Sequence, residues 1–306
     1  MKKCIVLLCL LLCGCQKNDE APVLKLNKSH IQVDVNSSID YLSYVHQAFD
    51  EVDGDLMSQV SYNEIDTSQV GQYQVLYSVK DKANHEVKQK LIVDVVKYYE
   101  DGIFSPIGVA FDTVENPDDI TVLVNKKHAI PENWKPNDLE FVIDNNQQML
   151  RKEANEAYTQ FYNAAKEKGI AIYSISGYRT NETQTKYWTN MVKVYGEEYA
   201  SKYSAYPLRS EHQLGLAIDI SYKTTGDRLS ESVADSEIGK FIVSDAYKYG
   251  FILRYPKDKV AITNYGYEPW HIRYVGVSLA KELHDKGLTL EEYYNEEKDY
   301  GNSEIL

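Results

Sequence analysis

Two short segments carry the residues that could do chemistry. The first reads Ser-Glu-His-Gln-Leu-Gly-Leu-Ala-Ile-Asp over residues 210–219, and the second reads Glu-Pro-Trp-His over residues 268–271. Together they offer two imidazoles, a carboxylate that can bind a metal and a carboxylate that can act as a base. A catalytic zinc site takes three protein ligands, leaves a position for water and uses a general base on that water. The pattern therefore predicts a hydrolytic zinc site with Glu268 as the base.

The residues around the first segment are expected to leave space beside Asp219. Residues 214–220 alternate in the manner of a strand, with Leu and Ile on one face and Gly, Ala and Asp219 on the other. Side chains this small leave room for an ion and a substrate, and His212 lies just before the strand. The alternative for this pair alone is a carboxylate hydrogen-bonded to a histidine in the core.

The second segment favours the metal interpretation. Pro269 cannot donate to a β ladder, so Glu268 need not follow the parity of the next strand and can face the same centre as His271. The ring of Trp270 would shield both from water and raise the pKa of the Glu268 carboxyl, which suits a base near neutral pH. The alternative is a salt bridge in a loop beside a packed tryptophan.

A third segment supplies a cation. Arg179 follows a predicted strand over residues 170–175 and precedes a predicted helix. A guanidinium there can hold a substrate carbonyl or carboxylate through two hydrogen bonds. Gln184, on the first turn of that helix, faces the same region. Taken alone, Arg179 would be interpreted as a surface residue.

In order, spacing and flanking residues, these segments resemble the VanY-type D-alanyl-D-alanine carboxypeptidases. That family belongs to the zinc peptidases that include lysostaphin-type enzymes and the Hedgehog signalling domain. The resemblance covers about residues 118–290, including the stretch over residues 123–139. It implies an α+β zinc peptidase domain with a central, mainly antiparallel sheet.

The resemblance also implies a role for each candidate residue. Glu268 would be the general base, and Arg179 would act on the scissile carbonyl or the substrate carboxylate. One Zn²⁺ ion would be held by three ligands: His212, Asp219 and His271. The residues expected to bind substrate are Arg179, Gln184, Ser210 and Trp270.

The implied reaction is the removal of terminal D-alanine from peptidoglycan stem peptides by metal-activated water, at the D-Ala-D-Ala bond. Three alternatives stay open. An L,D-carboxypeptidase acting on tetrapeptide stems would have the same metal site. An endopeptidase that cuts cross-bridges would need a cleft open at both ends, and a non-catalytic wall-binding protein would carry a vestigial site.

The first residues have the pattern of an export signal. The apolar run over residues 4–14 follows two lysines and is too short to span a bilayer. Its end, Leu-Cys-Gly-Cys, resembles the lipobox of bacterial lipoproteins. Residues 1–14 would then be a lipoprotein signal peptide, and Cys15 would carry a lipid anchor on the outer face of the bacterial cell membrane. The alternative is an ordinary secretory signal.

Composition excludes several other functions. All four cysteines lie in the leader, at positions 4, 9, 13 and 15. The mature chain would therefore contain no disulfide, no thiol nucleophile and no cysteine zinc site. The net charge of −13 argues against nucleic acid as a partner and against electrostatic adhesion to anionic lipid. No nucleotide cofactor is expected.

The rest of the chain divides by its periodicity. Short alternating runs separated by turns over residues 22–97 predict a small all-β sandwich that resembles bacterial Ig-like repeats. Its acidic cluster at residues 50–55 lacks the ligand order of a calcium loop and is predicted to be a turn. The other predicted parts are a tether (15–21), a linker (98–117), the carboxypeptidase domain (118–295) and an acidic tail (296–306).

Helical spacing from Leu150 to Ala164 predicts a helix that stops at Gly169. The other elements expected in this part of the chain are helices over residues 181–195, 236–249 and 277–286 and strands over residues 251–255 and 271–275.

Overall fold

The computed structural model describes residues 20–100, 102–224 and 228–294. The leader, Cys15 and the tail over residues 296–306 lie outside these ranges, so the signal peptide, the lipidation site and the tail stay predictions. Among the residues that the structure does describe, no helix combines the length and the apolar character needed to cross a membrane.

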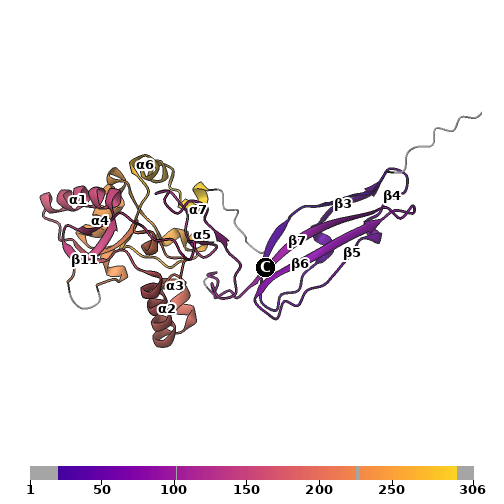
Figure 1. Ribbon diagram of the computed structural model, residues 1–306, viewed down its shortest axis with the longest axis horizontal. Helices are drawn as coiled ribbons and strands as arrows, with labels where there is room; N and C mark the ends of the chain where they lie inside the picture. Colours follow the sequence, from indigo (N-terminus) through magenta and orange to yellow (C-terminus); the bar gives the residue numbers. More distant parts are fainter. Residues whose placement is uncertain (1–19, 101, 225–227, 295–306) are drawn as a thin grey trace, which may run out of the picture. The chain divides into compact units, whose positions relative to one another are not determined.

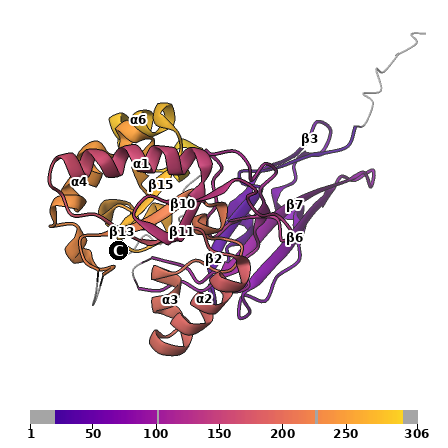
Figure 2. The ribbon, with the colours of Figure 1, turned by 60° about the vertical axis from the view of Figure 1, so that its left-hand side comes forward.

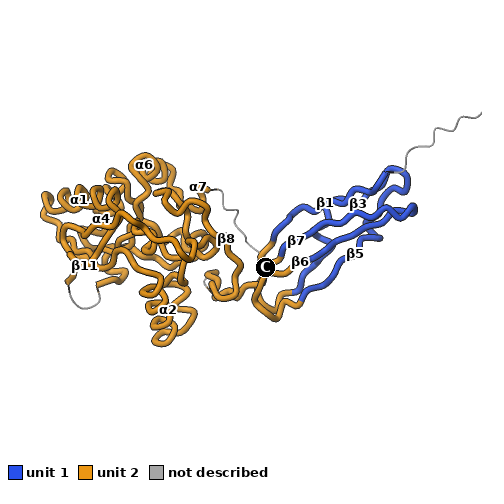
Figure 3. Tube along the Cα trace, viewed as in Figure 1, with its two compact units in different colours: residues 1–30, 38–65, 74–92 blue, residues 31–37, 66–73, 93–306 orange. Residues whose placement is uncertain are grey.

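The chain separates into two compact units (Figure 3). One comprises residues 1–30, 38–65 and 74–92, and the other comprises residues 31–37, 66–73 and 93–306. The domain boundaries expected from the sequence stay a prediction.

The N-terminal region consists of strands, as its alternating pattern predicts. One antiparallel sheet contains β1 (Val23–Leu26), β3 (Val45–Asp50) and β4 (Gly54–Asp55). A second sheet has the order β2 (His30–Asp34), β7 (Glu86–Val96), β6 (Gly71–Lys80) and β5 (Ser61–Tyr62). Val75, Tyr77 and Val79 of β6 are buried while the residues between them are more exposed, which is the period-two burial of a sheet with one inward face. Short 3₁₀ turns lie at η1 (Tyr41–Tyr44) and η2 (Met57–Gln59).

The larger unit contains the four-stranded sheet on which the site is built. Its order is β12 (Tyr173–Ser176), β13 (Ala217–Ser221), β15 (His271–Tyr274) and β14 (Phe251–Leu253), and every neighbouring pair is antiparallel. This confirms an α+β domain with an antiparallel sheet.

Two strands begin later than the alternation predicts. β12 begins at Tyr173, and β13 begins at Ala217, because Leu214 ends the 3₁₀ turn η3 (Glu211–Leu214) and Gly215 has a left-handed φ of 68°. A Cβ on Gly215 would lie 3.0 Å from the Leu139 side chain and 3.1 Å from Arg151. The left-handed backbone conformation therefore favours glycine at this position, and a larger residue would also have to displace these two side chains slightly.

The helices end where local signals place them. α1 (Lys152–Glu167) stops before Gly169, which has a φ of 75°. The hydroxyl of Thr180 caps α2 (Asn181–Tyr195) by accepting from the Thr183 N–H at 3.1 Å. The remaining helices are α3 (Glu197–Tyr203), η4 (Glu231–Val233), α4 (Glu237–Asp245), η5 (Ala246–Tyr249), η6 (Lys257–Lys259), α5 (Val260–Thr263), α6 (Val277–Lys286) and α7 (Leu290–Tyr293).

Helices α1 and α4 cover one face of the sheet, as the ribbon shows for this unit (Figures 1 and 2). Phe161 of α1 stacks on Phe241 of α4 at a centroid distance of 5.1 Å. Ile218 of β13 and Ile272 of β15 belong to the same buried cluster. Because side chains alternate across a strand, the residues next to each of these isoleucines in its own strand point to the opposite face.

The segment preceding the sheet also packs in this unit. β8 (Asp112–Thr113) pairs in parallel with β9 (His128–Ala129), and β10 (Leu139–Val142) forms a hairpin with β11 (Asn145–Arg151). The buried Lys126 ammonium donates to the Phe104 carbonyl at 2.6 Å. Much of the predicted linker, residues 98–117, therefore packs as part of the larger unit.

Candidate active site

The two predicted motifs meet through the register of the sheet. Asp219 of β13 lies directly opposite His271 of β15, and Ser176 of β12 lies opposite Asp219 on its other side. All three belong to the face that α1 and α4 leave uncovered. His212, on the turn η3 before β13, completes a cluster with Asp219 and His271 whose ligand atoms all lie within 4.8 Å of one another.

The tautomer of His212 follows from its partners. Its Nδ1 lies 2.8 Å from the Gly177 carbonyl oxygen. A carbonyl only accepts, so Nδ1 carries the hydrogen and Nε2 presents its lone pair. Nε2 lies 3.3 Å from Oδ2 of Asp219. Packing against Met149 requires glycine at position 177, because a Cβ there would lie 2.5 Å from the Met149 carbonyl oxygen.

His271 presents its other ring nitrogen to the cluster. Its Nδ1 lies 3.1 Å from Oδ1 of Asp219 and 3.7 Å from Oε2 of Glu268. Its Nε2 faces away, 3.4 Å from Oε2 of Glu211. The two imidazole rings are perpendicular, with centroids 4.9 Å apart. A ligand nitrogen from each ring therefore points to the same space.

A turn brings Glu268 to the same space. The His271 N–H donates to the Glu268 carbonyl at 3.1 Å, and the Glu268 N–H donates to the Tyr255 carbonyl at 3.1 Å. This turn over Pro269 and Trp270 releases Glu268 from the parity of β15, as the sequence predicts. Glu268, Trp270 and His271 line a cavity of about 390 Å³ together with Asp219 and His212.

Arg179 lies at the edge of this cavity and is held on several sides. Its Nη2 donates to Asp219 at 3.0 Å and to the Ser176 hydroxyl at 2.8 Å, and its Nη1 donates to Gln184 at 3.3 Å. The guanidinium carbon lies 4.6 Å from the centre of the Tyr187 ring. One planar cation is thus fixed beside the metal-ligating carboxylate.

Burial and neighbouring charges set the protonation of these groups. Burial raises the pKa of the Glu268 carboxyl to about 8, although the nearby His271 opposes the shift. Burial, helped by Arg179, lowers the pKa of His212 to about 4, so its imidazole is neutral and available as a ligand. Burial would lower the pKa of His271, but hydrogen bonds to Asp219 and Glu211 raise it to about 9. This cluster of carboxylates therefore favours a positive charge at His271 Nδ1.

Comparison with known proteins identifies the fold around this cavity. The family model of D-alanyl-D-alanine carboxypeptidase, VanY, matches residues 147–277. The chain is 45% identical to the putative carboxypeptidase YodJ of Bacillus subtilis (strain 168) over 194 residues, which cover 61% of this chain and 71% of YodJ. The chain belongs to the VanY family. It is also 36% identical to the bifunctional D-Ala-D-Ala dipeptidase and carboxypeptidase VanXYC of Enterococcus gallinarum, over 56% of this chain and 92% of VanXYC.

Solved structures agree with this assignment to the VanY family. The LdcB LD-carboxypeptidase superposes with a TM-score of 0.57 at 44% identity, covering 60% of this chain and 90% of LdcB. A mutant of the D,D-pentapeptidase VanY from the VanB-type resistance cassette, in complex with Zn(II), superposes with a TM-score of 0.51 at 34% identity. The superposition covers 57% of this chain and 98% of the VanY chain.

The donor set of this VanY domain fits zinc. One nitrogen from each of two imidazoles and one carboxylate converge within 4.8 Å, and this is a ligand set of catalytic zinc sites that keep a position for water. Each imidazole also has a partner for its other nitrogen, which fixes its tautomer and orientation. Zn²⁺ is therefore the cofactor, with His212, Asp219 and His271 as its ligands.

The structure brings together most of the residues predicted from the sequence. Ser210, Arg179 and Trp270 line the cavity with the metal ligands and Glu268. Gln184 is fully buried, does not belong to the cavity lining, and donates to the Ala205 carbonyl at 2.7 Å while accepting from Arg179. The substrate-binding roles of these residues stay predictions.

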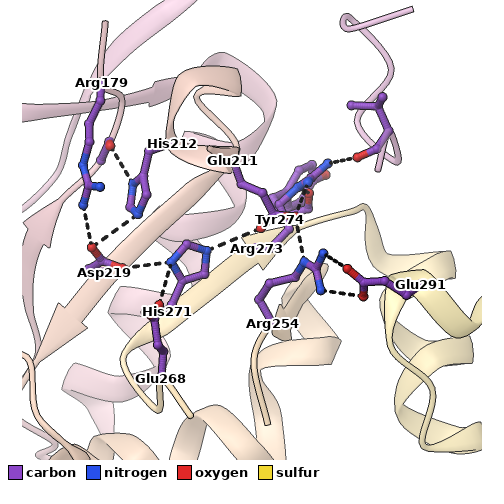
Figure 4. A network of polar contacts seen from close by, with 12 residues as sticks. Arg179, Glu211, His212, Asp219, Arg254, Glu268, His271, Arg273, Tyr274 and Glu291 are labelled. Carbon is purple, nitrogen blue, oxygen red and sulfur yellow. Dashed lines mark hydrogen bonds and ion pairs between the residues drawn. The ribbon is translucent and has the colours of Figure 1, made fainter. Parts of the chain in front are cut away.

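Sequence reasoning missed a group of buried charges behind His271 (Figure 4). Glu211 accepts from Arg254 at 2.7 Å and from Arg273 at 2.8 Å, and Arg254 also binds Glu291 through two hydrogen bonds of 2.9 and 2.6 Å. Both arginines lie in or beside strands of otherwise apolar residues. An arginine in or beside an apolar strand indicates a buried charge that needs a partner. The partners themselves could not be named, because they are distant in sequence.

Proposed function

We propose that this protein is a zinc-dependent carboxypeptidase that removes the terminal D-alanine from peptidoglycan stem peptides by hydrolysing the D-Ala-D-Ala bond. The observation that carries the proposal is the convergence of the His212–Asp219–His271 cluster and the buried Glu268 on one cavity. The D-Ala-D-Ala activity in the names of the VanY family and of VanXYC supports this substrate.

Glu268 moves the proton in the proposed reaction. Bound zinc would supply Lewis acidity toward a water molecule and the scissile carbonyl. Glu268 accepts a proton from the attacking water and returns it to the amine of the departing D-alanine. Its burial and its raised pKa of about 8 favour a carboxyl group that both accepts and releases a proton near neutral pH.

Arg179 orients the substrate and stabilises developing charge. Its guanidinium lies at the cavity, in contact with Asp219 and supported by Ser176 and Gln184. A donor fixed in this way costs little reorganisation when negative charge develops on the carbonyl oxygen. Ser210, which also lines the cavity, contributes a polar contact to the bound peptide.

A second candidate is the L,D-carboxypeptidase reaction on the tetrapeptide stem. The favouring observation is the identity of 44% to the LdcB LD-carboxypeptidase, against 34% to the D,D-pentapeptidase VanY. Both reactions release D-alanine and use the same metal cluster, so the shape of the cavity decides between them.

The test uses the full chain loaded with zinc. Stem pentapeptide and stem tetrapeptide are incubated separately, with and without a chelator, and D-alanine is measured by mass spectrometry. Chelator-sensitive release from pentapeptide supports the D,D reaction, and release from tetrapeptide alone assigns the L,D reaction. No release from either peptide by zinc-loaded protein contradicts the carboxypeptidase proposal and favours an endopeptidase or a non-catalytic wall-binding role.

We also propose that Cys15 carries a lipid that holds the enzyme on the outer face of the bacterial cell membrane, with the β-rich region as an Ig-like spacer toward the wall. The lipobox-like sequence over residues 12–15 supports this proposal. In cells, a Cys15→Ser variant is expected to move from the membrane fraction to the soluble fraction. Unchanged membrane association of that variant would contradict the anchor.

A further inference from the structure

Behind the metal cluster lies a buried group of two acids and two arginines: Glu211, Glu291, Arg254 and Arg273. All four side chains are 2% exposed or less. Burying charges costs several kcal/mol for each ion, and a buried pair rarely stabilises a fold more than apolar residues would. A network placed this deep, directly against a metal ligand, indicates a role beyond stability.

The two carboxylate oxygens of Glu211 have different partners. Oε1 accepts from Arg254 at 2.7 Å and from Arg273 at 2.8 Å. Oε2 lies 3.4 Å from Nε2 of His271. The arginines therefore hold the carboxylate by one oxygen and leave the other for the imidazole.

This arrangement selects one tautomer of His271. Two guanidinium groups donate to Oε1 of Glu211, so the group beside His271 is an ionised carboxylate whose oxygens only accept. The hydrogen of His271 then belongs on Nε2, and Nδ1 is the nitrogen left to bind a metal. Nδ1 is the atom that faces Asp219 and Glu268.

The arginines are anchored in turn by other parts of the fold. Arg273 donates to the Ile120 and Val122 carbonyls, each at 2.9 Å. Arg254 binds both oxygens of Glu291 on the short helix α7. Glu291 also accepts from Asn125 at 3.3 Å. Helix α7 lies beyond the residues that the VanY family model matches, 147–277.

We propose that Glu211 is a positioning residue that fixes His271 as an Nδ1 metal ligand, and that Arg254 and Glu291 extend this support to helix α7. The inference rests on the metal site of the proposed function but not on the identity of the peptide cleaved. Outer partners of metal-ligating histidines commonly contribute in this way to metal affinity.

The test measures zinc affinity of the full chain by competition with a chromophoric chelator. Glu211→Gln is expected to weaken zinc binding roughly 10- to 100-fold, because an amide NH₂ would face Nε2 and favour the wrong tautomer. Glu211→Asp keeps the charge for the arginines but withdraws the carboxylate from His271, so it is expected to weaken binding in a protein that still folds. Unchanged zinc affinity in a folded Glu211→Gln or Glu211→Asp variant would overturn the proposal.

A matched pair of variants tests the extension to α7. Glu291→Gln removes a charge that Arg254 needs and is expected to weaken zinc binding less than the Glu211 variants do. Glu292→Gln, on the same helix, removes only the ion pair with Lys259 and retains a side chain suited to the capping box, so zinc affinity stays unchanged. Equal losses in both variants would show that the docking of α7 matters rather than the charge of Glu291, and would overturn the extension.

A spectroscopic readout separates positioning from general stability. In ¹⁵N-histidine-labelled, zinc-loaded protein, the Nε2–H proton of His271 is expected to resonate downfield and exchange slowly, because it donates to a buried carboxylate. The signal is assigned by its loss in a His271→Gln variant. It should shift in Glu211→Asp and remain in Glu292→Gln. A His271 signal that is identical in wild type and Glu211→Asp would contradict the assigned role, whichever stem peptide the enzyme cleaves.

Discussion

Carboxylates gather in two regions of this protein, and their partners differ. In the turn between β3 and β4, Oδ1 of Asp50 accepts from the Val52 and Asp53 N–H groups at 2.7 and 2.8 Å. At the end of β4, Asp55 accepts from the Met57 N–H at 2.9 Å. These side chains are satisfied by nearby backbone, as in other Asx turns.

In the cavity of the larger unit, the carboxylates meet imidazoles and guanidiniums from distant parts of the chain. Asp219 contacts His212, His271 and Arg179. Glu268 approaches His271 only at 3.7 Å. The acids of the turn are bonded to backbone N–H groups, so they only stabilise local structure. The acids of the cavity are bonded to imidazoles and a guanidinium, which can change protonation, bind metal or contact substrate.

The largest expected effect comes from removing a ligand. His271→Ala should lose zinc and all measurable D-alanine release, because no other described residue completes the cluster. Metal content by atomic absorption and release by mass spectrometry check this. Asp55→Asn in the turn is the matched control and should change neither quantity. Full activity of His271→Ala would show that the cluster in the cavity is no more important for the reaction than the acids of the turn.

Replacing the base should separate metal binding from chemistry. Glu268→Gln is expected to keep zinc and to lower kcat by roughly 10²- to 10⁴-fold, the usual contribution of general acid–base catalysis. Single-turnover kinetics with zinc-loaded protein check this expectation. Loss of zinc from this variant would instead make Glu268 part of the ligand set.

Replacing the cation should have a smaller effect on the rate. Arg179→Ala is expected to lower kcat by about 10²- to 10³-fold, as when one oxyanion donor is removed. Arg179→Lys should recover only part of the loss, because an ammonium lacks the planar fork that meets Ser176, Gln184 and Asp219 together. A kcat of Arg179→Lys equal to that of the wild type would show that only the positive charge of Arg179 matters.

The smallest expected effect lies in the turn. Asp50→Ala removes two backbone hydrogen bonds from a buried side chain and should lower the free energy of unfolding of the N-terminal region by about 2 kcal/mol. D-alanine release and zinc content should not change. Urea denaturation followed by circular dichroism measures the first quantity. Loss of activity in this variant would show that the turn serves the reaction.

The sequence specified the metal cluster more fully than its support. The helix end at Gly169 could be predicted, because glycine at a left-handed φ is a local signal. The ligand set could be stated because the order, spacing and flanking residues of the motifs resemble those of the VanY family. The start of β13 was misplaced, because the left-handed Gly215 ends a 3₁₀ turn that alternation cannot reveal.

Contacts across long sequence separations were not available from the sequence. Glu211 joins Arg254 and Arg273 across 43 and 62 positions. Periodicity reports which face of an element is buried, but it does not report which buried charges meet.

Because Asp219 and His271 are paired across β13 and β15, zinc can bind only when the two strands are in the correct register. A shift of one residue between β13 and β15 would turn one of these ligands toward the apolar layer. Misaligned molecules would then lack the site, and a ligand that binds only the native arrangement stabilises it by mass action. The availability of zinc during folding would thus govern the yield of native enzyme as well as its activity.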